Sequence, residues 1–175
     1  MGVSCLYADY KDQANQTLDH ILGSLLRQLL TTAQEPIPDE VINKLDDNRR
    51  WGGKVGAEDI LALLKIRLHQ LKSAFICIDA VDELKPRVRQ QLLDILKELI
   101  THNTHLFLTG RGHIEGEVKK RFAQGYAVIL SASRHDIQRF VRHQINEDYD
   151  INPEAMDLVL AKDIEEAIIE RSKGM

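Results

Sequence analysis

One segment carries most of the information in this sequence: Ala74-Phe75-Ile76-Cys77-Ile78-Asp79-Ala80-Val81-Asp82-Glu83-Leu84. An apolar run typical of a buried strand leads here directly into three carboxylates. In open α/β folds, ligands bind beyond the carboxyl ends of parallel strands, and acids at that place commonly hold Mg²⁺ at a nucleotide's terminal phosphate. The segment therefore predicts a strand that ends at a nucleotide and metal site.

The three acids are expected to have separate roles at that site. Asp79 ends the strand, so its carboxylate is expected at the sheet edge as the Mg²⁺ ligand, directly or through water. Asp82 and Glu83 follow just beyond it and are expected to orient or deprotonate a water molecule. Carboxylates this close repel one another unless a cation lies near them. A simpler explanation stays open, in which the acids only complement the dipole at a helix amino terminus.

Arg111 is a further candidate site residue, because it follows another apolar run, 105–109, in the turn Gly110-Arg111-Gly112. The guanidinium presents planar donors that match phosphate oxygens. If the two strands are neighbours, Arg111 is expected at the same sheet edge as the acids, as a sensor of the γ-phosphate. The alternative is an exposed arginine in a glycine-rich turn.

The loop that normally grips the phosphates in such a site is missing from the sequence. No stretch of the 175 residues has the pattern G-x-x-x-x-G-K-[ST], whose amides and lysine cradle the phosphates. Gly52-Gly53-Lys54 is followed by Val55 instead of a Mg²⁺-binding hydroxyl, and no strand is predicted before it, so we assign it to a flexible loop. We therefore expect this chain alone to bind nucleotide weakly, with no cofactor held by it.

Size and composition are those of a soluble globular domain: 175 residues, of which 43% are hydrophobic and 29% charged. The net charge of −4 and the scattered basic residues argue against a nucleic-acid or anionic-membrane partner. The sequence has neither the pattern of a signal peptide nor an apolar run of membrane-spanning length. Cys5 and Cys77 each lie in an apolar run, which favours two reduced, buried packing thiols and a cytoplasmic location.

Short apolar runs alternate with amphipathic helical stretches, which is typical of βαβ units and a parallel sheet. Strands are expected at 3–8, 74–79, 105–109 and 127–130, and helices at 18–32, 58–71, 86–100, 114–122, 136–145 and 153–168. The proline- and glycine-containing stretch 33–56, with a short helical patch near Val41, is expected to be a surface insertion outside the core. Ser133 and Asp136 predict a capping box, and Asn152 with Pro153 predicts the start of the last helix.

The order F-I-C-I-D-A-V-D-E-L and then L-F-L-T-G-R resembles the Walker B and sensor-1 pair of NACHT domains, in the STAND class of P-loop NTPases. The strand around residues 5–10, the helix ending at 24–30 and the late segments 129–130 and 136–141 are similar in order and spacing to the fungal NACHT/ankyrin-repeat type and its nephrocystin-3-like N-terminal group. The resemblance covers essentially the whole chain. The usual T-S-R of the family stands here as Thr109-Gly110-Arg111.

The resemblance implies a Mg²⁺- and ATP- or GTP-dependent signalling switch that self-oligomerises on a signal from C-terminal repeats, as in fungal self-recognition and defence. It implies an α/β fold of three layers, the P-loop NTPase type, with helices on both faces of a parallel sheet. Residues 1–150 are then a partial nucleotide-binding core with an insertion at about 33–56, and 151–175 begin a following helical segment. The first strand, the Walker A loop and its helix are expected before Met1, so the core is expected to be incomplete.

In that family the strand feeding the phosphate loop lies between the sensor strand and the last strand. We therefore expect a sheet in the order 3–8, 74–79, 105–109, with 127–130 either detached or shifted across to pair with 105–109, and a poorly stable or aggregation-prone protein. Two alternative functions stay open: a degenerate, non-catalytic scaffold of the same fold, and a receiver-like phosphoacceptor domain. The latter also places Asp at a strand end, but it needs an acidic pair after the first strand and a lysine after the last, and we find neither in the sequence.

Overall fold

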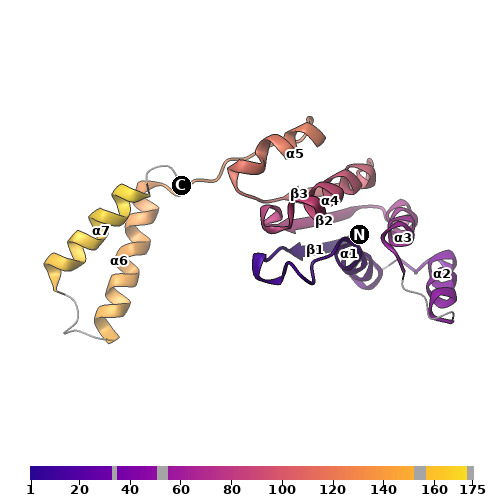
Figure 1. Ribbon diagram of the computed structural model, residues 1–175, viewed down its shortest axis with the longest axis horizontal. Coiled ribbons are helices and arrows are strands. Elements are labelled where there is room, and N and C mark those ends of the chain that lie inside the picture. Colours follow the sequence, from indigo (N-terminus) through magenta and orange to yellow (C-terminus); the bar gives the residue numbers. More distant parts are fainter. Residues whose placement is uncertain (33–34, 51–54, 152–156, 173–175) are drawn as a thin grey trace. The chain divides into compact units, whose positions relative to one another are not determined.

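The computed structural model describes residues 1–32, 35–50, 55–151 and 157–172 (Figure 1). The chain divides into two compact units, Met1–Gly125 and Tyr126–Met175. The first unit contains the sheet and the predicted site, and the second contains a pair of helices. Each unit is described by itself.

A parallel three-stranded sheet forms the centre of the first unit. Its strands are β1 (Gly2–Tyr7), β2 (Ala74–Asp79) and β3 (Thr104–Leu108), in the spatial order β1-β2-β3. Tyr7 is in register with Asp79, and Ile78 with Leu108, so the three strands end together at one edge. The predicted α/β class, parallel direction and order of these strands are confirmed.

The prediction of a fourth strand at 127–130 is wrong. This segment has no regular secondary structure, and Val128, Ile129 and Leu130 are 79%, 84% and 88% exposed. A strand persists only where a neighbour takes up its backbone hydrogen bonds, and no strand of the described residues pairs with this segment. Its β-branched composition alone does not make it a strand.

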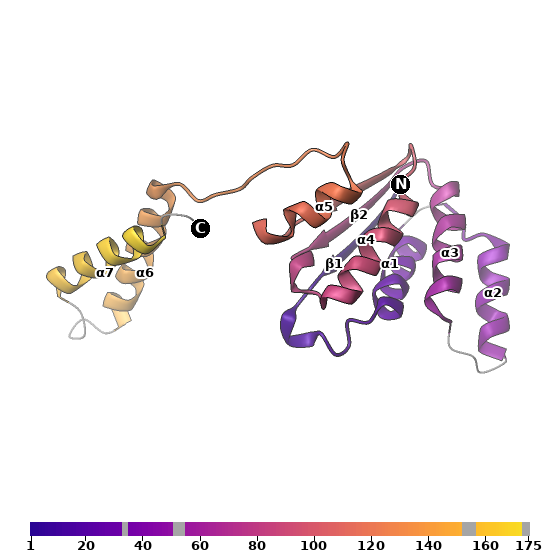
Figure 2. The same cartoon turned by 45° about the horizontal axis from the view of Figure 1, so that its top comes forward.

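Three amphipathic helices lie on one side of the sheet (Figure 2): α1 (Leu18–Thr32), α3 (Ala57–Gln70) and α4 (Pro86–Leu99). The helices predicted at these places are confirmed, and Pro86 opens α4 as expected. Their apolar stripes meet the strands in one core, which includes Leu22, Leu25, Leu29, Leu63, Leu64, Leu68, Ile76, Ile78, Leu92, Leu93 and Leu96. A shorter helix, α5 (Glu115–Arg121), packs against α4.

The stretch predicted as a surface insertion contains a regular helix, α2 (Asp39–Arg50). Val41 is 0% exposed and belongs to the core, and Leu45 and Val55 pack partly against that core. The prediction that this stretch lies outside the core is therefore wrong at Val41, because Val41 and Leu45, spaced i and i+4, give a mostly polar helix one apolar stripe. The assignment of Gly52-Gly53-Lys54 to a flexible loop falls outside the described residues.

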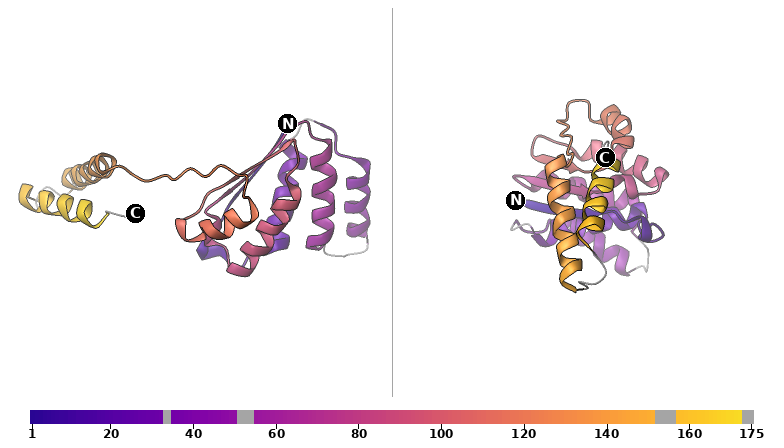
Figure 3. Two further views of the ribbon diagram at one scale, coloured as in Figure 1. Left: turned by 90° about the horizontal axis from the view of Figure 1, so that it is seen from above. Right: turned by 90° about the vertical axis from the view of Figure 1, so that its left-hand side faces the viewer.

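The two faces of the sheet differ sharply in burial. Ile76 and Ile78 are each 1% exposed, whereas Tyr7 and Phe107 are 67% and 58% exposed. The exposed side, here called the open face, carries Val3, Cys5, Tyr7, Phe75, Cys77, Asp79, His105 and Phe107. No helix of the described part of Met1–Gly125 covers this face, and Figure 3 shows the helices of that unit gathered on the other side. The second helical layer that the resemblance implies is not formed by these residues.

The open face also corrects the expectation for the two cysteines. Both thiols are free, but Cys5 is exposed and Cys77 is half-buried. The prediction of two buried packing thiols is therefore wrong for Cys5, because the side of β1 that carries it is not covered.

The second unit consists of α6 (Arg134–Ile151) and α7 (Leu158–Arg171), which pack against each other. The predicted capping box is confirmed: the Asp136 N–H donates to Ser133 Oγ at 3.1 Å, and the Ser133 N–H donates to Asp136 Oδ2 at 3.2 Å. Asp157 caps α7, and its Oδ1 accepts from two backbone N–H groups of the first turn. The predicted start at Asn152 and Pro153 falls outside the described residues.

None of the helices in the described ranges is both long and apolar enough to cross a bilayer.

Candidate functional site

The site lies where the three strands end and the chain turns into short 3₁₀ helices. These are η1 (Tyr10–Asp12) after β1, η2 (Val81–Glu83) after β2 and η3 (Gly112–Ile114) after β3. All four predicted site residues, Asp79, Asp82, Glu83 and Arg111, lie at this edge. The edge is the one at which parallel α/β sheets bind ligands.

Asp79 is held in place by a residue of the neighbouring strand end. The Thr109 hydroxyl donates to Asp79 Oδ1 and accepts from the Ala80 N–H at 2.9 Å. The Thr109 N–H donates to the Ile78 carbonyl at 3.0 Å, which continues the ladder between β2 and β3. Asp79 is nonetheless exposed, so its carboxylate is oriented and still accessible, as a Mg²⁺ ligand has to be.

Thr109 is a site residue whose role the sequence prediction missed. The available signal was a hydroxyl at the end of the strand beside the acidic one, where a donor reaches the first carboxylate. That signal has meaning only once β3 is known to neighbour β2.

A left-handed residue turns the chain from β2 into η2. Ala80 has φ 53° and ψ 43°. Among the described residues, no other non-glycine residue has a positive φ. This conformation costs an alanine about 1–2 kcal/mol, and such strain is concentrated at functional sites. The turn is fixed by the Val81 N–H, which donates to the Thr109 carbonyl at 2.9 Å. Asp82 and Glu83 are thereby brought back beside the end of β3.

Asp82 is buried and fastens the loop that carries Arg111. Its side chain is 5% exposed, and its Oδ1 accepts from the Arg111 N–H at 3.2 Å. A Cβ at Gly110 would lie 2.7 Å from Ile114 Cδ1, so the end of that side chain would have to move, and 3.4 Å from Asp82 Oδ1, which is an ordinary contact.

Glu83 connects the end of β1 to the same site. Its Oε2 accepts from the Tyr10 N–H at 3.1 Å, and its backbone carbonyl accepts from Gln13 Nε2 at 2.6 Å. Its Oε1 lies 3.8 Å from a terminal nitrogen of Arg111. The Glu83 side chain is 19% exposed, so it keeps some contact with solvent while joining all three strand ends.

Arg111 lies over the acids without being locked to them. Its side chain is 76% exposed, and its closest approaches to Asp82 and Glu83 are both 3.8 Å. An exposed ion pair is worth about 0–1 kcal/mol, so a phosphate group would compete for this guanidinium at little cost.

Arg89 is a second residue that the sequence prediction missed. It supports η2 by donating to the Asp82 and Leu84 backbone carbonyls, both at 3.3 Å.

The carboxylates do not converge on a single point. Asp79 is bonded to Thr109, whereas Asp82 and Glu83 face Arg111, so their mutual repulsion is relieved by separation and by a cation. Within the described residues, no three or more His, Cys, Asp or Glu side chains are grouped to hold a metal ion. A single carboxylate is still sufficient for a Mg²⁺ that takes its other ligands from phosphates and water.

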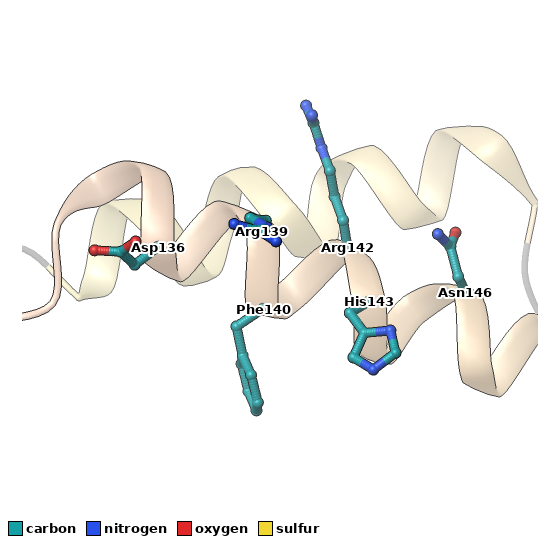
Figure 4. A pocket seen from close by; sticks show the side chains of 6 residues that line it. All are labelled: Asp136, Arg139, Phe140, Arg142, His143 and Asn146. Carbon is teal, nitrogen blue, oxygen red and sulfur yellow. The ribbon is translucent and has the colours of Figure 1, made fainter.

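A surface hollow in the second unit is unrelated to this chemistry. Its lining comes entirely from α6: Asp136, Arg139, Phe140, Arg142, His143 and Asn146. Figure 4 shows these side chains pointing away from the helix in several directions, with no common centre. We assign no ligand to it.

Comparison with known proteins places the first unit in a family. Residues 1–111 match the profile of the family described as Nephrocystin 3, N-terminal. The curated proteins give no match. Among solved structures, the chain is similar to a Walker-type ATPase of Pyrococcus abyssi, with 12% identity and a TM-score of 0.43 over 94% of this chain and 51% of that one. The chain thus spans about half the length of that ATPase, and a likeness this low says nothing about its chemistry. Because the matched residues include all three strands and every predicted site residue, the chain belongs to the Nephrocystin 3, N-terminal family.

Proposed function

We propose that this chain forms the Mg²⁺- and γ-phosphate-facing part of a nucleotide-dependent switch of the P-loop NTPase type. The observation that carries the proposal is the meeting of three parallel strand ends, where Thr109 orients Asp79 and Arg111 lies beside Asp82 and Glu83. Asp79 holds Mg²⁺, directly or through water, and Arg111 reaches the γ-phosphate.

Glu83 is the residue best placed to orient or deprotonate the attacking water. It keeps 19% of its side chain exposed, whereas Asp82, with 5%, is more enclosed. Asp82 contributes to the same task by fixing the Arg111 backbone and by lying 3.8 Å from the Arg111 guanidinium. The water then loses its proton to Glu83 as it attacks the phosphorus in line with the leaving oxygen.

The grip on the phosphates has to come from outside these residues. Amides and a lysine of a glycine-rich loop supply most of that grip in P-loop proteins, and the sequence contains no such loop. In a protein that carries one, the nucleotide is ATP or GTP with Mg²⁺. The finer proposal, from the NACHT resemblance, is a cytoplasmic signalling switch that self-oligomerises under the control of C-terminal repeats.

A second candidate function is a non-catalytic scaffold that keeps the sheet and has lost turnover. The observation that favours it is that Glu83 and Asp82 already accept hydrogen bonds from the Tyr10 and Arg111 backbone. On this alternative the acids tie the three strand ends together and do nothing further.

Steady-state hydrolysis in a form that carries a phosphate-binding loop separates the two candidates. Asp79→Asn should abolish Mg²⁺-dependent turnover, and Glu83→Gln should keep nucleotide binding but slow turnover by about 10²–10⁴-fold, the usual contribution of a general base. Asp59→Asn, an exposed acid in the first turn of α3, is the matched control and should not change the rate. Hydrolysis at the parental rate by both site variants would refute the roles of Asp79 and Glu83, and a parental form that binds nucleotide without hydrolysing it would favour the scaffold.

A further inference from the structure

The two cysteines of the chain lie side by side on the open face. Cys5 and Cys77 are direct partners in the register of β1 and β2. Side chains of directly paired residues in a sheet point to the same face, so the two thiols are neighbours although the residues are far apart in sequence. This pair plays no part in the acidic site.

Both thiols are free, and the pair is accessible from solvent through Cys5. Burial raises the pKa of the Cys77 thiol, and the adjacent Cys5 raises it further. Around the pair, the open face is mainly apolar, with Asp79 two residues beyond Cys77 on β2 and His105 paired with Phe75. In the described residues, no three or more His, Cys, Asp or Glu side chains are grouped to hold a metal ion, so the two thiols are the ligands that this place offers. A ligand that takes this pair therefore has to be thiophilic enough to displace both protons.

Strand geometry favours a bridging atom over a direct S–S bond. Neighbouring strands lie about 4.7–4.9 Å apart, and parallel register keeps paired Cβ atoms at a similar separation. A disulfide needs Cβ atoms about 3.5–4.5 Å apart, so closing one would pull β1 and β2 together. An atom bound between the two sulfurs needs no such movement.

We propose that Cys5 and Cys77 form a two-coordinate thiolate site for a soft monovalent metal ion of the Cu(I) type. Soft thiolate ligands select Cu(I). A tetrahedral Zn²⁺ site needs four ligands, and the described residues provide no third or fourth histidine, cysteine or acid around this pair. On binding, two S–H bonds break, two S–Cu bonds form and two protons leave to solvent, with no change in oxidation state.

The test is a competition titration of the 175-residue chain with Cu(I) buffered by bicinchoninate under anaerobic conditions. The chain should remove one Cu(I) per monomer from the chelator. Cys5→Ser and Cys77→Ser should each weaken binding by at least about 100-fold, because losing a ligand outweighs the 10–100-fold cost of losing an outer-shell partner.

The matched control keeps two thiols on the same face but breaks their register. In Cys5→Ser with Val3→Cys, the second thiol moves two residues along β1, about 6.6 Å, to pair with Phe75. Circular dichroism checks that this variant folds. Weak binding by the folded control supports the site. The proposal fails if the control binds as tightly as the parent, if the parent does not bind, or if one Cu(I) is shared by two chains.

Discussion

The two edge strands of the sheet, β1 and β3, differ in whether side chains bond their outward-facing backbone groups. Along β1, the Gln28 side chain bonds the Cys5 N–H at 2.9 Å and the Cys5 carbonyl at 2.8 Å, and the Thr32 hydroxyl bonds the Val3 N–H and carbonyl at 3.3 and 2.9 Å. Helix α1 thus satisfies the free backbone groups of that edge.

In the described residues, the outer edge of β3 has no such hydrogen bonds from side chains. The Thr109 N–H donates to Ile78 and the Ala74 N–H donates to Asn103, so odd-numbered residues of β3 face β2, and the backbone groups of Leu106 and Leu108 point outward. In the described residues, no side chain bonds those outward groups, and β3 carries no Lys, Arg, Asp or Glu to discourage pairing. The β1 edge is therefore covered by side chains of α1, whereas the β3 edge is left open to pairing with another strand.

The largest expected effect contrasts the covered and open faces of the sheet. Ile76→Ala should lower the free energy of unfolding by about 2–5 kcal/mol, because Ile76 is buried in the core. Phe107→Ala, on the open face, should change it by no more than about 0.5 kcal/mol. Urea unfolding followed by circular dichroism measures both. Equal losses would show that the open face is covered in solution.

Removing the side-chain hydrogen bonds along the β1 edge should have the next largest effect on the free energy of unfolding. Gln28→Ala deletes two hydrogen bonds to Cys5, each worth about 0.5–1.5 kcal/mol, so we expect a loss of about 1–3 kcal/mol in the same assay. Gln90→Ala, an exposed glutamine of α4, is the control and should cost no more than about 0.5 kcal/mol. If the two variants are equally stable, the Gln28 bonds do not hold the edge.

The unsealed edge of β3 should drive self-association. We expect the parent chain to form larger species as its concentration rises, and Phe107→Lys to shift sedimentation toward the monomer, because an edge lysine opposes strand pairing. Phe140→Lys adds the same charge at a side chain of similar exposure, 65%, on α6 instead of a strand. Equal suppression by both variants would point to charge alone rather than to the edge.

The smallest expected effect concerns the ion pair that holds α5 beside α4. Arg121 binds Asp94 through two nitrogens at 2.6 and 3.2 Å, and this hydrogen bonding lowers the pKa of Asp94 below its ordinary value of 3.8. A lowered pKa in the folded state stabilises the protein above pH 3.8, and this contribution is lost as the pH falls through the lowered value. Asp94→Asn should therefore make the free energy of unfolding depend less on pH, as measured by unfolding between about pH 2 and 5. Carboxyl NMR of the parent chain measures the pKa of Asp94 itself. An Asp94 that titrates at its ordinary pKa would rule out the pair in solution.

Elements whose sequence signals are local could be predicted well. The run that ends in Asp79 gave the bounds of β2, and Pro86 gave the start of α4. The acids and Arg111 could be assigned to one edge because parallel strands end together. Segment 127–130 has an equally apolar composition, but a strand depends on its neighbour, and the sequence of the segment does not contain that information.

Contacts between distant segments could not be predicted. Arg67 is 0% exposed and donates to the backbone carbonyls of Leu29, Glu35 and Pro36, which a scan along α3 cannot reveal. The hydrogen bond from Thr109 to Asp79 could not be predicted for the same reason, because it depends on the register of β2 and β3. The exposure of Cys5 depends on a missing layer rather than on its own neighbours in sequence.

The most direct test of the central claim is a calorimetric titration with Mg·ATP and Mg·GTP. We predict that this chain alone binds either nucleotide weakly or not at all. A form that also carries a glycine-rich phosphate loop should bind one of them with micromolar affinity, and Asp79→Asn in that form should remove the dependence on Mg²⁺. Micromolar binding by the present chain, or Mg²⁺ dependence that survives Asp79→Asn, would contradict the assignment of this strand edge to Mg²⁺ and the γ-phosphate.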